Sequence, residues 1–137
     1  MFKQLVAHAD APGFGHMFNW GLRIGEFTEL YFLTGQGDVD ANLQVRHPGD
    51  PLEQTRRCFA HHAGMLAQAG YTWNDVVWAE ATVTKAFDVA ANFAGFAEIW
   101  AETFQDVAVK PAAGVFRVVD ALALPEMLIE IQLLAAK

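Results

Sequence analysis

Two apolar stretches near the C-terminus each carry a single charged residue, and this pattern constrains the fold most strongly. Residues 114–120 are rich in β-branched side chains around Arg117, and residues 127–133 alternate in polarity around Glu130. Such patterns predict two β-strands, here joined by a tight connection that ends in Pro125. A charge in an apolar strand is costly unless it is paired, lies at a sheet edge or faces a pocket or interface. The two charges therefore indicate either a functional site or edge-strand residues that only discourage aggregation.

The N-terminal part of the chain favours strands. Residues 2–6, 21–25 and 30–33 form short apolar runs, and glycines bound the second of them. Because the second and third runs lie only a few residues apart, we expect them to pair as a hairpin. Residues 38–50 have no periodic pattern and contain Pro48-Gly49, which predicts a surface loop.

Two helices are expected, separated by a further strand. Asp50 followed by Pro51 is a typical helix start, and Gly70 is a typical end. Residues 76–84 are β-branched and aromatic, which predicts a strand. A second helix is expected to begin within residues 88–92, because aromatic side chains then recur at helical spacing. This stripe, which is far more often core than a cofactor site, consists of Phe93, Phe96, Trp100 and Phe104.

The order of these elements predicts one α+β domain over residues 1–137, with a mixed sheet and both helices on one face. A chain of 137 residues is long enough to bury a core unaided. Hydrophobic residues make up 53% of it and charged residues 18%. Such an apolar composition suits a protein that buries additional surface in an oligomer.

Charge and residue usage exclude several classes of protein. A net charge of −7, with 9 lysines and arginines, argues against a nucleic-acid partner. No apolar run reaches the roughly 18 residues of a spanning helix and no signal peptide is recognisable, so we expect a soluble cytoplasmic protein without a membrane partner. Cys58 has no second cysteine to pair with. The adjacent His61 and His62 would project about 100° apart on a helix and cannot share a metal ion.

Four segments together resemble the RidA/YjgF family, also called the L-PSP endoribonuclease or translation-inhibitor family. No single segment is specific, but their order and spacing match the family over residues 17–136. The segments are Leu33-Thr34-Gly35-Gln36 after a strand, the first helix with Gln54-Thr55-Arg56, the turn and strand of residues 70–84, and residues 125–131 at the end.

The resemblance implies a chorismate-mutase-like (YjgF/L-PSP) fold assembled as a homotrimer, with a central β-barrel and the helices outside. It implies clefts between subunits that bind small carboxylates. Well-studied members hydrolyse enamines and imines such as 2-aminoacrylate to ketoacids and ammonia, with neither metal nor organic cofactor. An arginine, two positions after the proline that follows the second helix, binds the carboxylate. A glutamate in the last strand orders the attacking water, and a tyrosine near the N-terminus lines the cleft.

Part of this pattern carries over directly. Glu130 aligns with the family glutamate, and Gly35 and Gln36 align with its glycine-glutamine turn. These three residues are therefore expected at the cleft.

The remainder of the pattern is altered. Two positions after Pro111 stands Ala113 in place of the arginine, and Arg117 follows four residues later. A bulge or a shifted register could bring Arg117 to the cleft or leave it elsewhere on the strand. The family tyrosine is replaced in a segment that contains Phe18 and Trp20.

The first hypothesis is therefore a RidA-like homotrimer that binds a carboxylate-bearing metabolite between subunits and acts as an enamine or imine deaminase without a cofactor. The alternative is a non-catalytic ligand-binding or regulatory trimer. Endoribonuclease activity ranks lowest, because the chain is acidic. The first hypothesis assigns Arg117 as the anion anchor, Glu130 as the water-positioning group, Gly35 and Gln36 as cleft wall, and Phe18 and Trp20 as an apolar lid.

Overall fold

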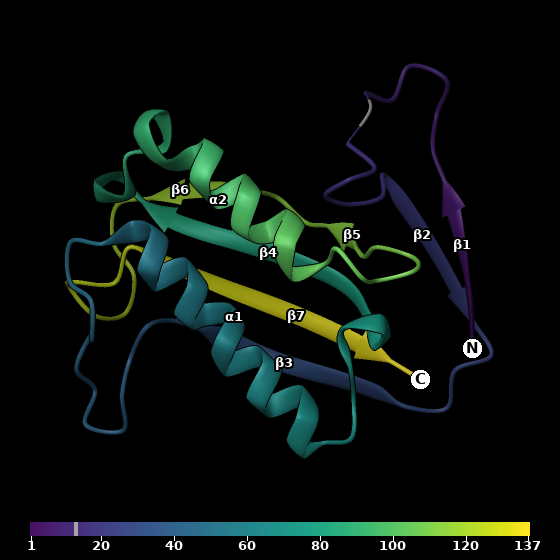
Figure 1. The fold of residues 1–137 in the computed structure, drawn as a ribbon, viewed down its shortest axis with the longest axis horizontal. Helices are drawn as coiled ribbons and strands as arrows, with labels where there is room; N and C mark the ends of the chain where they lie inside the picture. Colours follow the sequence, from purple (N-terminus) through teal and green to yellow (C-terminus); the bar gives the residue numbers. More distant parts are fainter. Residues whose placement is uncertain (13) are drawn as a thin grey trace.

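The computed structural model describes residues 1–12 and 14–137. Its strands and helices follow the predicted order along the chain (Figure 1). Three strands come first, then a helix, a strand, the second helix and the C-terminal strands. In chain order they are β1 (Phe2–Val6), β2 (Gly21–Gly25), β3 (Leu30–Gln36), α1 (Pro51–Gln68), β4 (Val76–Thr84), α2 (Val89–Thr103), β5 (Ala112–Ala113), β6 (Arg117–Val119) and β7 (Ile129–Ala136).

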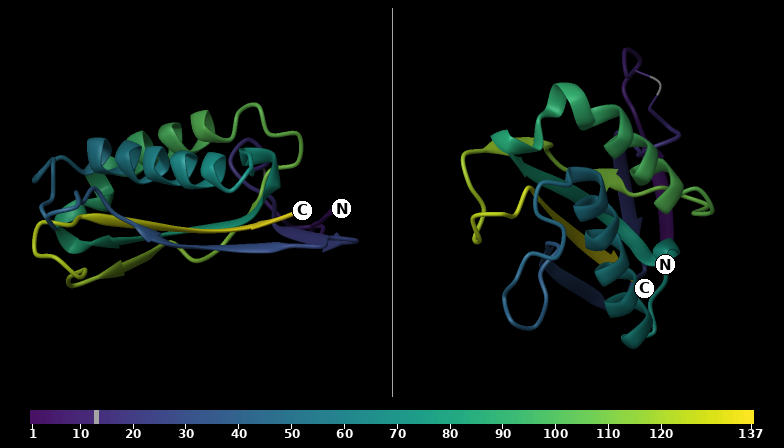
Figure 2. Two further views of the ribbon diagram at one scale, coloured as in Figure 1. Left: turned by 90° about the horizontal axis from the view of Figure 1, so that it is seen from below. Right: turned by 60° about the vertical axis from the view of Figure 1, so that its left-hand side comes forward.

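The main sheet is mixed, and both helices cover one of its faces, as predicted. Its strand order is β3-β7-β4-β5, with β6 also paired to β4. Strand β4 is antiparallel to β7 and parallel to β5 and β6. The edge-on view in Figure 2 places α1 and α2 above the sheet and leaves the opposite face uncovered. We call that opposite surface the open face.

The predicted hairpin between residues 21–25 and 30–33 is wrong. Strand β2 pairs with β1, and β3 pairs with β7 at the other end of the chain. Leu33 of β3 is 1% exposed, because β3 pairs with β7 at the edge of the main sheet and Leu33 joins the core between sheet and helices. Two strands that are close in sequence can form a hairpin. Their spacing does not indicate, however, whether pairing with a distant strand would bury more apolar surface than the hairpin does.

The strand expected over residues 114–120 is also corrected: only Arg117–Val119 of that range form a strand, β6, and a second short edge strand, β5, lies just before the range at Ala112–Ala113. Ala113 pairs with Ala79, and Arg117 pairs with Thr82. Arg117 is four residues after Ala113, whereas Thr82 is only three residues after Ala79. The edge segment β5–β6 therefore contains one residue more than the matching part of β4, as in a β-bulge. Because side chains alternate between faces, the extra residue places Ala113 on the helix-covered face and Arg117 on the open face. Strand β4 also separates β6 from β7.

The helix ends follow the predicted capping chemistry. The carboxylate of Asp50 accepts a hydrogen bond from the backbone N–H of Glu53, and Pro51 is the first residue of α1. Gly70, just after α1, has a φ of +75°, which glycine adopts without strain. Helix α2 begins after Asp88, whose side chain accepts from the N–H of Ala91.

The core lies between the helices and the sheet and is rich in aromatic residues. Phe104 is 0% exposed, and its ring packs edge-to-face on Trp73 and Phe59. Of the predicted aromatic stripe, Phe96, Trp100 and Phe104 are buried, whereas Phe93 is 43% exposed. The stripe is therefore core except at its first member, which lies at the edge of a cavity described below.

Neither helix of the described chain is long and apolar enough to cross a membrane. Within residues 1–12 and 14–137, histidine, cysteine and acidic side chains do not gather in groups of three that could hold a metal ion. Cys58 is buried in α1, and this burial raises the pKa of its thiol far above the ordinary range. The thiol is thus packed and is a poor nucleophile.

Candidate functional site

The open face carries a row of polar side chains across three strands. Thr82 of β4 is paired with Glu130 of β7 on one side and with Arg117 of β6 on the other. Paired residues of neighbouring strands project to the same face, so all three side chains lie on the open face. Two strand spacings of about 4.8 Å place the Cα atoms of Arg117 and Glu130 roughly 10 Å apart.

Arg117 is held by an acidic partner on β4. Its Nη1 donates to Oε1 of Glu80 at 2.9 Å, and the side chains are 46% and 13% exposed, respectively. The carboxylate of Glu80 lies over Gly114, where an added Cβ would be 2.5 Å from Oε2. A glycine is thus required for the carboxylate to lie in this position. Together Glu80, Glu130 and Arg117 carry a formal charge of −1.

Glu130 lies over a glycine in the same way. A Cβ added to Gly35 would be 2.0 Å from Oε1 of Glu130. Strand β3 has an irregular register between Leu33, which pairs with Leu133, and Gln36, which pairs with Ile131. Three residues of β3 there match two of β7, and this bulge turns Gly35 toward the open face and Glu130.

A buried polar network positions the turn that leads into β7. Gln54 of α1 is 0% exposed, and its amide donates to the carbonyl oxygens of His47 and Glu126. Its Oε1 accepts from the backbone N–H of Leu128 at 2.9 Å. Gln54 belongs to one of the four segments that resemble the RidA/YjgF family. Its hydrogen bond to Leu128 fixes the backbone two residues before Glu130.

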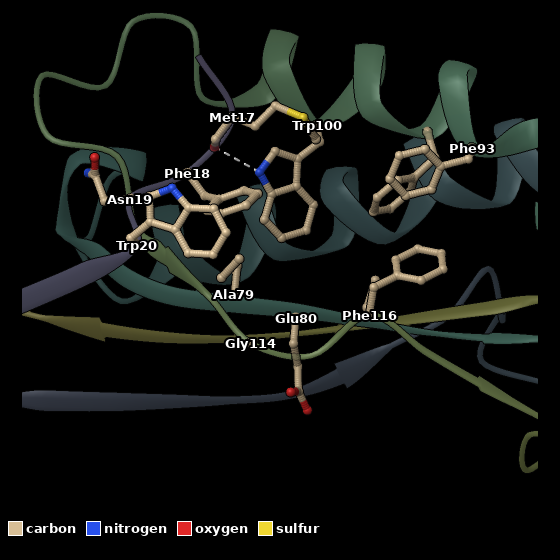
Figure 3. A pocket seen from close by; sticks show the side chains of 13 residues that line it. Met17, Phe18, Asn19, Trp20, Ala79, Glu80, Phe93, Trp100, Gly114 and Phe116 are labelled. Atoms are coloured by element: carbon tan, nitrogen blue, oxygen red, sulfur yellow. Dashed lines mark hydrogen bonds between the residues drawn. The ribbon is translucent and has the colours of Figure 1, made fainter. Parts of the chain in front are cut away.

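Phe18 and Trp20 lie on the other side of the sheet. They line a cavity of about 230 Å³ under α2, together with Trp100 and Phe116 (Figure 3). The floor of this cavity includes Ala113, which stands where the resemblance leads us to expect an arginine. Within one subunit the structure therefore brings Glu130 and Gly35 together, with Arg117 across β4, but does not join them to Phe18 and Trp20.

Gln36 is next to this group without touching Glu130. It pairs in register with Ile131, and its amide Nε2 donates to the carbonyl oxygen of Thr34 at 3.0 Å. Its side chain is half-buried and folds back on its own strand.

Sequence reasoning missed Glu80. The signal was present, because Glu80 is a single charge in the apolar strand 76–84, as Arg117 and Glu130 are in theirs. The contribution of Phe116 to the cavity carried no comparable signal, because its orientation depends on the extra residue between β5 and β6.

Comparison with known proteins decides the family. The family model described as Endoribonuclease L-PSP matches residues 11–137. The chain belongs to this family. A curated relative, a RutC family protein (PH0854) of Pyrococcus horikoshii, is 30% identical over 136 residues, which cover 98% of each chain. A second RutC family protein, from Pyrococcus abyssi, is also 30% identical and covers 100% of this chain and 99% of that protein.

Solved structures support the same assignment. The Rid family protein YyfB of Yersinia pestis, described as of unknown function, superposes with a TM-score of 0.85, 28% identity and full coverage of both chains. Yeast Mmf1 superposes with a TM-score of 0.61 over 99% of each chain at 19% identity, which shows a common fold alone. The L-PSP/Rid chain described here thus has the α+β architecture of the family.

Proposed function

We propose that this Rid family protein is a homotrimer with a central β-barrel that binds small carboxylate-bearing molecules in clefts between its subunits. The open face supports self-association because it exposes apolar side chains. Phe32 is 73% exposed and is paired with Leu134, which in turn is paired with Trp78. An apolar row of this kind across three strands is typical of a surface that another chain covers.

The proposed reaction is hydrolysis of an imine to a ketoacid and ammonia. Arg117 binds the carboxylate of the substrate, because its guanidinium has five N–H donors and Glu80 engages Nη1, leaving others free. Glu130 orders a water molecule and accepts a proton as the water oxygen bonds to the imine carbon. The nitrogen then receives this proton from Glu130 and a second proton from the new hydroxyl group. The C–N bond breaks as the C=O bond of the ketoacid forms, and ammonia leaves. The chemistry needs neither metal nor cofactor.

The observation that carries this proposal is the carboxylate of Glu130, half-buried and held against Gly35 on the face that carries Arg117. A carboxylate fixed in this way is suited to position water. Gly35 and Gln36 form the wall beside it. In the trimer, Phe18 and Trp20 are proposed to serve as the apolar lid from the subunit edge.

Hydrolysis of freshly generated 2-iminopropionate tests the proposal. We expect wild type to accelerate hydrolysis, Glu130→Gln to lose at least a hundredfold in kcat, and Arg117→Ala to raise KM by about tenfold or more. Arg57→Ala serves as a matched control, because Arg57 pairs with Glu53 on the exposed side of α1. Equal rates for wild type and Arg117→Ala would remove Arg117 from the mechanism.

A second candidate function is ligand binding without turnover. Two observations favour it: Ala113 occupies the position of the family arginine, and Glu80 neutralises Arg117. The net negative charge of this polar group weakens its attraction for a carboxylate. Saturable binding of pyruvate with no turnover on a panel of imines would favour this candidate. Glu80→Gln should then strengthen pyruvate binding several-fold, because it releases the guanidinium of Arg117.

A further inference from the structure

Two segments that are distant in the sequence bring Glu130 and Gly35 together. Gly35 lies in β3 and Glu130 in β7, and the segments continue side by side beyond this contact. A Cβ added to Gly37 would clash with Cε of Met127 and would be 3.7 Å from the carbonyl oxygen of Ile129. The position of the Glu130 carboxylate therefore depends on how the segment after β3 is held against the turn before β7.

Asp38, the next residue after Gly37, has a buried carboxylate. Its side chain is 0% exposed, and Oδ2 accepts from the backbone N–H of His47 at 2.8 Å. The ring Nδ1 of His47 lies 2.8 Å from the same oxygen. An ionised carboxylate only accepts hydrogen bonds, so Nδ1 carries the proton in this contact. Asp38 needs these partners, because burial removes the hydration of its carboxylate.

The loop between Asp38 and His47 is closed at its base. The backbone N–H of Arg46 donates to the carbonyl oxygen of Asp38 at 3.0 Å. Val39 and Val45 form an antiparallel bridge one residue further into the loop. The backbone of the loop thus holds His47 beside Asp38, in addition to the contact that its ring makes.

The carbonyl group of His47 links this loop to the turn before β7. Its oxygen accepts from Nε2 of Gln54 at 2.9 Å, and the same nitrogen donates to the carbonyl oxygen of Glu126 at 3.1 Å. Oε1 of Gln54 accepts from the backbone N–H of Leu128 at 2.9 Å. One side chain therefore binds His47 and the backbone on both sides of Met127.

These contacts form one continuous set of hydrogen bonds. The set, which we call the Asp38 network, consists of Asp38, His47 and Gln54 with the backbone groups that they bind. It joins the segment after Gly35 to the turn before Glu130. Hydrogen bonds in a buried network are stronger than in water and restrict the groups that they join.

We propose that the Asp38 network positions Glu130 for the reaction, and that its three side chains are positioning residues. The inference rests on the proposed function, because it acts through the water that Glu130 orders. Misplacing a reacting group by about 1 Å can cost a hundredfold in rate. Arg117 is held separately, by Glu80 of β4, so binding of the substrate carboxylate does not depend on the network. Loss of the network should therefore lower kcat and leave KM nearly unchanged.

Hydrolysis of 2-iminopropionate by two variants of His47 tests this role. Leucine cannot donate to Asp38, whereas the amide of asparagine places an N–H donor near the position of Nδ1. We expect His47→Leu to lower kcat by about tenfold or more with KM changed by less than about threefold, and His47→Asn to keep roughly half of the wild-type kcat or more. Wild-type kcat in His47→Leu, or equal losses in both variants, would overturn the proposal. His61→Leu, at another half-buried histidine, is the matched control and should keep wild-type kinetics.

Amide hydrogen exchange of residues 126–131 measures the network without any substrate. Gln54→Met removes both hydrogen-bonding ends of the side chain at similar volume and should speed exchange in this segment by about tenfold or more. Gln68→Met, at an exposed position of α1, is the matched control and should leave the exchange unchanged. Because His47 is half-exposed, His47→Leu provides the same measurement if Gln54→Met does not fold. Unchanged exchange in the folded variant would overturn the proposal, whether or not the protein is an enzyme.

The two measurements together separate this inference from the proposed function. Absence of imine hydrolysis by wild type would overturn the proposed function, and the kinetic role of the network with it. Inactive Glu130→Gln alongside wild-type kcat in His47→Leu would overturn this inference alone. Faster amide exchange together with a lower kcat, an unchanged KM and rescue by His47→Asn is the result that the proposal predicts.

Discussion

The contact between Gly35 and Glu130 gives the sharpest prediction about the polar site. In Gly35→Ala the new Cβ would be 2.0 Å from Oε1 and 2.7 Å from the carboxyl carbon of Glu130. Ordinary contact begins at about 3.4 Å, so the oxygen has to move by about 1.4 Å or more. Gly35 does not have a positive φ, so alanine fits the backbone itself.

The displacement should affect function far more than stability. The group that has to move is the end of a flexible side chain, so the free energy of unfolding should fall by only about 0.5–1.5 kcal/mol. Misplacing a reacting group by about 1 Å can cost a hundredfold in rate. Gly35→Ala should therefore lower kcat for 2-iminopropionate by about a hundredfold, close to the loss in Glu130→Gln.

Steady-state kinetics and urea denaturation measure the two effects on the same samples. Gly64→Ala is the matched control, because an added Cβ there meets nothing within 4 Å on the exposed side of α1. It should keep full activity and stabilise the helix by about 0.5–1 kcal/mol. Wild-type kcat in Gly35→Ala alongside inactive Glu130→Gln would refute the reasoning that Gly35 leaves room for a fixed carboxylate.

Two further predictions concern stability. His62 is 0% exposed, its Nε2 is 2.7 Å from the carbonyl oxygen of Ile131, and burial lowers its pKa below the ordinary 6.5. The unfolded chain therefore binds a proton near pH 6.5 before the folded chain does, so the stability that neutral His62 provides is full above pH 6.5 and falls as the pH drops below it. Urea denaturation at fixed protein concentration should show that the free energy of unfolding falls by on the order of 1 kcal/mol between pH 7.5 and 5.5. This fall should be absent in His62→Gln and present in His61→Gln. Equal pH dependence in the two variants would contradict the assignment to His62. Phe104→Ala should lower the free energy of unfolding by about 3–5 kcal/mol in the same assay, because Phe104 is fully buried among aromatic rings, and a loss below about 1 kcal/mol would contradict its place in the core.

The helices and the central strand could be predicted because their signals are local. Asp50 and Pro51 specify a helix start through hydrogen bonding and a fixed φ, whatever the rest of the chain does. Strand β4 has the predicted bounds, because five of its nine residues from Val76 to Thr84 are β-branched, at both ends of the strand. Pairing partners are not local, and β2 and β3 therefore could not be assigned from their spacing.

The geometry of the polar site was predictable only in part. Glu130 lies against Gly35, and the resemblance places both residues at one cleft, which remains a prediction. The face on which Arg117 lies depends on one extra residue between β5 and β6, which leaves no mark in the polarity pattern. The ion pair between Arg117 and Glu80 depends on that register, so it could not be predicted before the register was known. Whether Arg117 and Glu130 act in catalysis remains a prediction.

The molar mass of the protein in solution tests the central claim most directly. The proposed site requires a partner subunit over the open face, where Phe32 is 73% exposed. Light scattering coupled to size-exclusion chromatography should give about 45 kDa, three times the 15.1 kDa of the chain, and Phe32→Asp should lower that mass. A mass of about 15 kDa for wild type at micromolar concentration would contradict the account, because Arg117 and Glu130 would then face open solvent.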